Sequence, residues 1–351
     1  MTNIENFRSI AGRTGYDYMP IQFSMCPDLE SRFGEYAREQ GIQYEQGSTR
    51  VPLLEPKAAD ESVFRGYYHR EFKPGTIFTP YGVAKEPGDA AAFHMTRMYH
   101  PMEDFDSPEE ILAYPFPDYS VADLTPVRRA VEELHAADRV AVGYASNVIF
   151  EPAWYLRGME NLMVDMMMDD PMAELLLDKL TQCAIDRVRL YAGCGVDVIH
   201  MGDDVGSQTS LLMSEELYCT WLKPRLTRVI AAIREVNPDI LVLYHSCGYV
   251  KPLIPHLIDA GIDILNPVQP ECMDFQEIHR EFGDKIAFNG TIGTQSTMPF
   301  GTPEEVRREV FRNLEIAGDR GGLFVAPTHL LEPEVPVENV AAYIQACKDF
   351  T

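Results

Sequence analysis

The sequence of 351 residues predicts an α/β fold, a (β/α)₈ TIM barrel. From residue 121 onward, short apolar segments typical of buried strands alternate with longer segments typical of helices. The connections between them are short, which indicates parallel strands joined by right-handed crossovers. We expect a single domain over residues 1–351. Within it, residues 121–351 form the regular part of the barrel, and residues 1–120 form an irregular extension that caps the barrel mouth.

The first 120 residues carry the weaker signals. Residues 18–24 predict a strand, and residues 28–40 predict a short charged helix. Residues 62–102 are rich in Tyr, Phe, His, Pro and Gly, which favours short strands, loops and a hairpin. We count one barrel strand within residues 75–100. The segment Ser107-Pro-Glu-Glu110 combines an N-cap residue, a proline and two acids, so a helix begins there.

The remaining elements follow in strict alternation. The expected helices span residues 124–137, 152–167, 171–191, 214–235, 250–260, 272–282, 302–317 and 336–348. The expected strands span residues 139–145, 196–201, 240–245, 262–266, 285–289 and 322–326. Active sites of such barrels lie on the loops that follow the strands. The polar residues at these strand ends are Ser146, Asn147, Asp203, Asp204, His245, Cys247, Asn266, Asn289 and His329.

The composition restricts the partners. The chain has 54 acidic and 30 basic residues, and its formal charge of −24 repels nucleic acid and anionic membrane surfaces. It has no 18-residue uncharged apolar segment and no signal-peptide pattern at its start, so we expect a cytoplasmic protein. Seven cysteines without CxxC spacing are typical of a reducing compartment and not of a disulfide framework.

A His-x-Cys motif is the main chemical signal. His245 and Cys247 follow an apolar strand, and residues i and i+2 of an extended chain point to the same side. Imidazole nitrogen and thiolate sulfur are ligands that zinc prefers, although a buried histidine beside a small apolar cysteine gives the same pattern. His329 follows the last strand and would be a third ligand, or alternatively a loop-capping residue. Glu151 or Asp203 would complete the coordination, unless the fourth position is open to water or substrate.

A second constellation is Met201-Gly-Asp-Asp204. Two carboxylates at a strand end can accept hydrogen bonds from a substrate or orient a ligand histidine, although Asp204 is also suited to capping the next turn. Gln208 adds a neutral hydrogen-bonding group to the same loop. We also assign Asn147 and Asn289, at two other strand ends, as candidate cofactor-binding residues.

Several motifs resemble the uroporphyrinogen decarboxylase superfamily. The similarity is clear over residues 140–350 and faint before them, and it implies a (β/α)₈ barrel. The matching segments are Gly202-Asp-Asp-Val-Gly-Ser-Gln208, His245-Ser-Cys-Gly248, Asn266-Pro-Val-Gln-Pro270, Phe300-Gly-Thr-Pro-Glu-Glu-Val306, Gly322-Leu-Phe-Val-Ala-Pro-Thr-His329 and Pro336-Val-Glu-Asn-Val340.

The superfamily contains two chemistries. True decarboxylases bind a porphyrinogen without a cofactor, using arginines near the amino terminus and an aspartate on an early strand. This chain has Gln22-Phe-Ser-Met-Cys-Pro-Asp-Leu-Glu30 after its first strand, without the arginine cluster. We therefore expect a mouth lined with acids and few arginines, which would repel a poly-anionic substrate. The other branch contains zinc-dependent, corrinoid-linked methyltransferases and demethylases with a His-x-Cys and a later third ligand, usually cysteine, where this chain has His329.

The resemblance therefore implies a zinc methyltransferase or demethylase. It would move a methyl group between a small methylated substrate and a corrinoid, either on a carrier protein or as free cobalamin. The zinc would act as a Lewis acid, and the corrinoid would supply the methyl-carrying chemistry. Asp203, Asp204, Gln208 and Asn266 are the candidate catalytic residues. The alternatives are a uroporphyrinogen decarboxylase and a non-catalytic, regulatory barrel, and a homodimer is one expected assembly.

Overall fold

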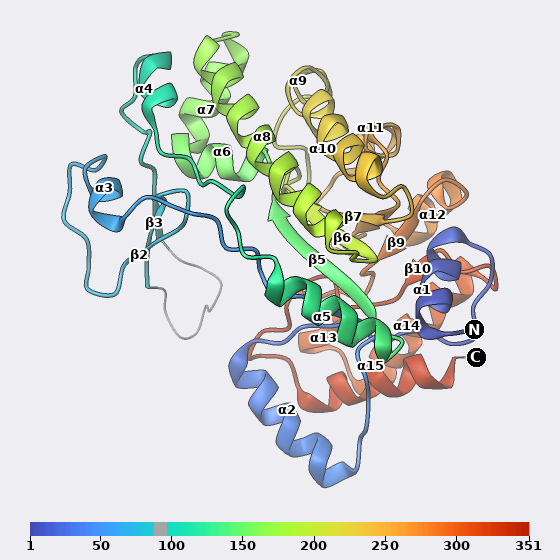
Figure 1. Ribbon diagram of the computed structural model, residues 1–351. Coiled ribbons are helices and arrows are strands. Elements are labelled where there is room, and N and C mark those ends of the chain that lie inside the picture. Colours follow the sequence, from blue (N-terminus) through green and yellow to red (C-terminus); the bar gives the residue numbers. More distant parts are fainter. Residues whose placement is uncertain (88–96, 351) are drawn as a thin grey trace.

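A computed structural model describes residues 1–87 and 97–350 of the chain (Figure 1). Its centre is a curled parallel sheet of seven strands in the order β1-β5-β6-β7-β8-β9-β10, which is also their order in the sequence. The strands are β1 Ser48–Arg50, β5 Val140–Asn147, β6 Val198–Gly202, β7 Leu241–His245, β8 Ile264–Asn266, β9 Ala287–Asn289 and β10 Leu323–Phe324. All six strands predicted after residue 121 are confirmed, with small shifts of their ends.

Helices connect these strands and cover the outer face of the sheet (Figure 1). They are α5 Thr125–Ala136, α6 Phe150–Arg157, α7 Met159–Met167, α8 Pro171–Gly193, α9 Glu215–Trp221, α10 Lys223–Val236, the 3₁₀ helix η1 Lys251–Leu253, α11 Ile254–Ala260, α12 Phe275–Phe282, α13 Thr297–Phe300, α14 Pro303–Ala317 and α15 Val337–Asp349. The helix predicted over 152–167 is interrupted at Gly158, whose φ of 84° ends α6 and leads into α7. No described helix is both long enough and apolar enough to cross a membrane.

The eight-stranded barrel is confirmed only in part. The segment predicted as a strand over 18–24 pairs at two isolated positions, Ile21 with Gln46 and Met25 with Leu331, both in parallel orientation. It thus lies between the chain that enters β1 and the chain that leaves β10. The structure therefore has seven parallel strands and one bridging segment, and a fully closed barrel remains a prediction.

The amino-terminal part differs most from expectation. The barrel strand predicted within 75–100 is wrong, because that region forms a separate antiparallel sheet in the order β2-β3-β4. Its strands are β2 Ile77–Phe78, β3 Ala84–Glu86 and β4 Arg97–Tyr99, and β2 and β3 form the hairpin expected within 62–102. Residues 88–96 of that range lie outside the described residues. Between residues 13 and 120 the described helices are α2 Pro27–Gln40, α3 Glu61–Arg65 and α4 Pro108–Ala113, of which α2 and α4 were predicted.

Helix α1, Asn3–Gly12, closes the amino-terminal end of the sheet. It begins with a capping box between Thr2 and Glu5, and its apolar side packs on the first inward-facing residues of the strands. This cluster contains Phe7, Ile10, Ala11, Val140, Val142, Val198, Leu243, Ile264, Ala287 and Phe324. The concave face of the sheet is therefore filled at one end and accessible from the carboxyl ends of the strands.

Replacing Phe7 tests this closure. The side chain is 3% exposed, and its ring centroid lies 4.3 Å from that of Phe324. We expect Phe7→Ala to lower the free energy of unfolding by about 3–5 kcal/mol, as is usual for a buried phenylalanine. Phe300→Ala is the matched control, because Phe300 is 78% exposed and should change that free energy by less than about 0.5 kcal/mol. Equal effects in urea unfolding would contradict the role of α1.

Candidate metal centre and active site

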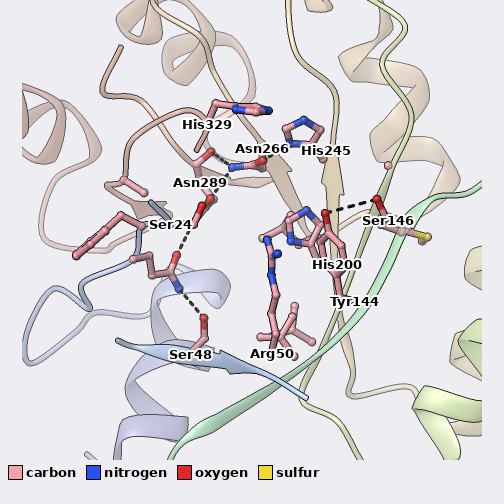
Figure 2. A pocket seen from close by; sticks show the side chains of 18 of the residues that line it. Ser24, Ser48, Arg50, Tyr144, Ser146, His200, His245, Asn266, Asn289 and His329 are labelled. Carbon is pink, nitrogen blue, oxygen red and sulfur yellow. Dashed lines mark hydrogen bonds between the residues drawn. The ribbon is translucent and has the colours of Figure 1, made fainter. Parts of the chain in front are cut away.

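A cavity of about 650 Å³ opens at the carboxyl ends of the parallel strands (Figure 2). Alternate residues of a strand point to one face of a sheet, so every second strand residue faces this space. The register places Gly202 beside His245 and His245 beside Asn266. The inward-facing polar residues are Ser48, Arg50, Tyr144, Ser146, His200, His245, Asn266 and Asn289.

Three of the predicted metal ligands lie together at this mouth. One ligand atom from each of His245, Cys247 and His329 lies within 4.8 Å of the other two, and Cys247 Sγ is 3.4 Å from His245 Nε2. The first two follow β7, and His329 lies on the loop after β10. Two imidazoles and one thiol form a donor set that suits zinc. A second cavity of about 390 Å³ is lined by Cys247 and His329, and the larger one by His245 and His329, so both cavities border this group.

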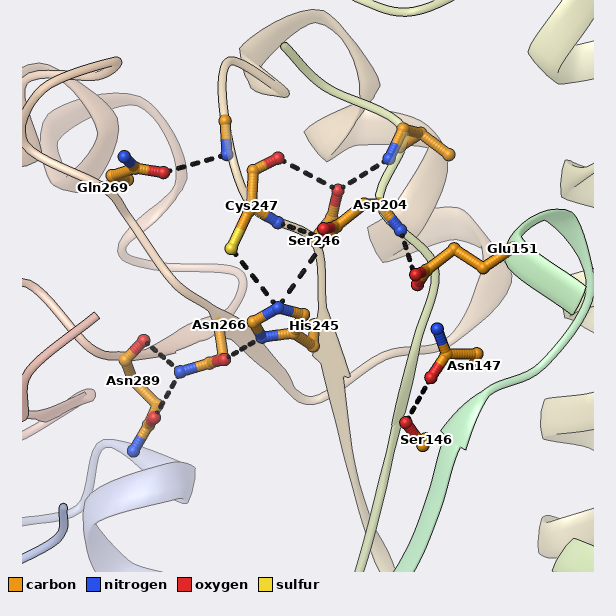
Figure 3. A network of polar contacts seen from close by, with 12 residues as sticks. Ser146, Asn147, Glu151, Asp204, His245, Ser246, Cys247, Asn266, Gln269 and Asn289 are labelled. Carbon is orange, nitrogen blue, oxygen red and sulfur yellow. Dashed lines mark hydrogen bonds and ion pairs between the residues drawn. The ribbon is translucent and has the colours of Figure 1, made fainter. Parts of the chain in front are cut away.

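A chain of hydrogen bonds fixes which nitrogen of His245 faces the ligand group (Figure 3). The Asn266 side-chain nitrogen donates to the backbone carbonyl of Asn289 at 3.1 Å and to its Oδ1 at 2.6 Å. Because a backbone carbonyl can only accept, Asn266 Oδ1 must point the other way, toward His245 Nδ1 at 2.5 Å. Nδ1 therefore carries a proton, which leaves Nε2, on the side of Cys247, as the nitrogen that could bind a metal.

Close backbone approach brings the loops after β6 and β7 together. A Cβ atom on Gly202 would lie 2.1 Å from the carbonyl oxygen of His245. One on Gly248, whose φ is 82°, would lie 2.5 Å from the carbonyl oxygen of Ser207. Glycine at these positions therefore allows the carboxylate loop to pack directly against the His-x-Cys loop.

Asp204 and Glu151 extend the network away from Cys247 (Figure 3). Asp204 Oδ1 accepts the backbone N–H of Cys247 at 2.8 Å, and Glu151 Oε2 accepts the backbone N–H of Asp204 at 3.1 Å. The Tyr155 hydroxyl donates to Glu151 Oε1 at 2.5 Å. Burial, together with the charges of Asp203 and Asp204, raises the pKa of Glu151 to about 8. Glu151 is not part of the three-residue ligand group, so its role as a fourth ligand remains a prediction.

Asp203 has a different environment from Asp204. It is 3% exposed, and its carboxylate accepts the backbone N–H groups of Val148, Ile149 and Glu151 at 2.9–3.2 Å. Burial raises its pKa to about 7, although these hydrogen bonds act in the opposite direction. These contacts hold the start of α6 and thereby the position of Glu151. A direct catalytic role for Asp203 remains a prediction.

The other candidate residues occupy both cavities. Asn147 lines the larger one and donates to the Tyr155 hydroxyl at 3.0 Å. Asn289, on the same cavity, donates to Gln22 Oε1 at 2.5 Å. Gln208 lines the smaller cavity, where its amide nitrogen donates to Gln295 Oε1 at 2.6 Å. Their contact with a cofactor or substrate remains a prediction.

The expected acid-lined mouth is wrong for the larger cavity. Among the described residues, Arg50, Arg139 and a single carboxylate, Glu151, line it. The sequence did not reveal Arg50, because β1 has only three residues and no apolar pattern. It also did not reveal His200, which lies within β6 and 5.0 Å from Tyr144 between ring centroids. Burial is the main cause that lowers the pKa of His200, and the nearby His245 lowers it further. The imidazole of His200 is therefore neutral at physiological pH.

The family model of uroporphyrinogen decarboxylase (URO-D) matches residues 98–350, so the chain belongs to this family. It is 27% identical over 210 residues to a methylated-thiol–coenzyme M methyltransferase of Methanosarcina mazei, covering 57% of this chain and 51% of that protein. It is 26% identical over 188 residues to a uroporphyrinogen decarboxylase of Vesicomyosocius okutanii subsp. Calyptogena okutanii, covering 53% and 52%.

The chain thus spans about half the length of the curated relatives that it matches. A solved structure of a methyltransferase from Methanosarcina mazei superposes with a TM-score of 0.68 at 19% identity. That superposition covers 100% of this chain and 99% of the other. At this identity it establishes a common fold for the two chains.

The raised pKa of Glu151 predicts a pH-dependent stability. An acid whose folded pKa is about 8, against an ordinary value of 4.5, stabilises the fold below pH 4.5 and loses that contribution as the pH rises toward 8. In metal-free protein, the free energy of unfolding should fall less steeply over this pH range in Glu151→Gln than in wild type. A smaller fall should remain, because the pKa of Asp203 is also raised, to about 7. Glu71→Gln, at an exposed position, is the control. Parallel curves for Glu151→Gln and wild type would contradict the burial of a titrating carboxyl.

Proposed function

We propose that this chain is a zinc-dependent methyltransferase or demethylase. It would move a methyl group between a small methylated substrate and a corrinoid, carried on a partner protein or supplied as free cobalamin. The observation that carries the proposal is the group formed by His245, Cys247 and His329 at the mouth of a substrate-sized cavity. The similarity to a protein named as a methylated-thiol–coenzyme M methyltransferase supports it.

The donor set fits zinc. His245 would offer Nε2, the nitrogen on the side of Cys247, because Nδ1 donates to Asn266. Burial raises the pKa of the Cys247 thiol, so metal binding there would have to displace its proton. Zinc at this position would supply Lewis acidity toward a thiol, alcohol or ether group of the substrate. Three protein ligands would leave a fourth position open to water or substrate.

The protein residues then position the substrate and its proton. Asn266 holds His245, and Asp204 fixes the backbone of Cys247. Glu151 lines the cavity and keeps a proton at neutral pH, so it can exchange that proton with the substrate heteroatom. Asp203 sets the position of Glu151 through the start of α6. In this assignment Asp203 and Asn266 act through their neighbours, whereas Glu151 reaches the substrate.

The remaining roles are also proposals. Asn147 and Asn289 would contact the corrinoid or the substrate from the larger cavity, and Gln208 would do so from the smaller one. Both cavities border the ligand group, which suits a reaction in which two bulky groups meet at one centre. We place the reaction in the cytoplasm, with a corrinoid carrier protein as the partner and a homodimer as the expected assembly.

A uroporphyrinogen decarboxylase is the alternative, because other relatives carry that name. The cavity fits it less well. The resemblance to decarboxylases implies an aspartate on an early strand. In this chain the early strand β1 instead turns Ser48 and Arg50 toward the cavity. Two arginines are also few for a substrate with many carboxylates. A non-catalytic barrel has no specific observation in its favour.

Methyl transfer tests the proposal. Zinc-loaded protein is mixed with free cob(I)alamin and dimethyl sulfide, methanol or (methylsulfanyl)acetate, and methylcobalamin is followed by its absorbance. We expect product with at least one donor, loss of activity after removal of zinc by a chelator, and recovery when zinc is returned. Cys247→Ser should be inactive. Cys219→Ser, in α9 away from the ligand group, is the matched control and should keep the activity.

Two results would contradict the proposal. One is the absence of methylcobalamin with every donor. The other is the conversion of uroporphyrinogen to coproporphyrinogen by the same preparation at a rate that zinc removal does not change.

A further inference from the structure

We propose that Gln22 is a positioning residue for the ligand group, because its side chain holds the amides that orient His245. This inference rests on the proposed function and extends its metal centre to a residue outside residues 98–350, the part of the chain that the family model matches. It follows from the fixed backbone around Gln22, from a row of side-chain amides that joins Gln22 to His245, and from the direction in which these amides donate.

The backbone around Gln22 is held from several elements. The Tyr343 hydroxyl of α15 accepts the Gln22 N–H at 3.1 Å and lies 3.0 Å from the carbonyl oxygens of Gln22 and Val325. The side-chain amide of Gln46 pairs with the N–H and the carbonyl of Phe23, at 3.2 and 3.1 Å. These contacts tie the segment to α15, to the chain that leaves β10 and to the chain that enters β1. The Gln22 side chain therefore starts from a fixed point.

The Gln22 side chain is one end of an amide row, formed by Gln22, Asn289 and Asn266 at the larger cavity (Figures 2 and 3). Gln22 Oε1 accepts from the side-chain nitrogen of Asn289 at 2.5 Å, and the Gln22 side-chain nitrogen donates to the Ser48 hydroxyl at 3.4 Å. Asn289 Oδ1 accepts from Asn266 at 2.6 Å, and Asn266 Oδ1 accepts from His245 Nδ1 at 2.5 Å. The side chains of Asn289 and Asn266 thus connect Gln22 with the ligand group.

The amide row can donate in only one direction. The backbone carbonyl of Asn289 accepts from the Asn266 nitrogen, which fixes the orientation of the Asn266 amide. Asn289 then presents Oδ1 to Asn266 and its side-chain nitrogen to residue 22. Residue 22 must therefore be a hydrogen-bond acceptor, which the side-chain oxygen of Gln22 supplies.

An acceptor at residue 22 holds the side chain of Asn289 in place. Without that acceptor the Asn289 nitrogen loses its partner, and its side chain is free to turn away from Asn266. Asn266 then keeps the backbone carbonyl of Asn289 but loses Oδ1 as a second acceptor, so it holds the ring of His245 less firmly. The identity of residue 22 thereby affects which nitrogen of His245 faces Cys247.

Zinc affinities of the full-length chain, measured by competition with a chelator, test this role. Gln22→Met keeps the length of the side chain but removes the acceptor. It should weaken zinc binding by about 3- to 10-fold, as for the loss of one neutral hydrogen bond. Gln22→Glu keeps the acceptor and should bind zinc at least as tightly as wild type. Gln345→Met, at an exposed position of α15, is the matched control and should change the affinity by less than about 2-fold.

A double-mutant cycle tests whether the effect passes through Asn266. In an Asn266→Ala background the amide row is already interrupted, so Gln22→Met should cause no further loss of zinc affinity. Fully additive losses would overturn the inference, because they would mean that Gln22 acts on the site by another route. A loss in Gln22→Glu as large as that in Gln22→Met would overturn it as well.

The ring of His245 in metal-free protein gives a second measurement, independent of zinc and of methyl transfer. Nitrogen NMR of histidine-labelled protein, well above the ordinary histidine pKa of about 6.5, shows which ring nitrogen carries the proton. The signals are assigned by comparison with His245→Ala. Wild type and Gln22→Glu should carry the proton on Nδ1, and Gln22→Met should show a mixture of the two tautomers.

The two measurements separate this inference from the proposed function. A wild-type proton on Nε2, or the same spectrum in wild type and Gln22→Met, would overturn the role of Gln22. The expected tautomers in a protein that transfers no methyl group would uphold that role and reject the proposed function. Methyl transfer by a protein whose tautomers do not depend on residue 22 would reject the role of Gln22 alone.

Discussion

The hydrogen bond from Asn266 to the backbone carbonyl of Asn289 is the contact on which the proposed metal centre depends. It fixes the orientation of the Asn266 amide, the amide fixes the proton on His245 Nδ1, and the proton leaves Nε2 as the ligand atom. Leaving a buried amide group without a hydrogen-bond partner costs about 1–3 kcal/mol, so the reversed orientation of the Asn266 amide is unfavourable. Three neighbouring strands, β7, β8 and β9, thus determine the state of a single imidazole.

The parallel sheet positions both the Asn266–Asn289 hydrogen bond and the larger cavity. Its register places Gly202, His245 and Asn266 side by side, and the close backbone approach at Gly202 and Gly248 brings the loop with Asp204 against Cys247. Helix α1 fills the opposite end of the concave face. The accessible space therefore lies where the strands end, between the ligand group and Arg50. One geometric arrangement therefore accounts for the proposed zinc ligands and for the cavity beside them.

The sequence was sufficient for β5 to β10 and for most helices, because their apolar segments and caps are local signals. It also identified His245 and Cys247, whose spacing alone places them on one side of the chain. It could not identify β1 or Arg50, because three polar residues show no strand pattern until β5 pairs with them. The prediction of an acid-lined mouth was wrong for the larger cavity because the sequence does not show where a carboxylate points. The Asp203 carboxylate binds backbone N–H groups at the start of α6 and does not face the cavity.

X-ray absorption at the zinc edge of the purified chain tests the central claim most directly. The account predicts about one zinc per chain, with one sulfur at about 2.3 Å and two nitrogens at about 2.0–2.1 Å. The sulfur contribution should vanish in Cys247→Ala, and His245→Ala should lose most of its zinc. His256→Ala, which removes a histidine of α11 that pairs with Glu215 at 2.7 Å, should keep the wild-type spectrum. Protein without zinc, or a spectrum without sulfur, would contradict the account.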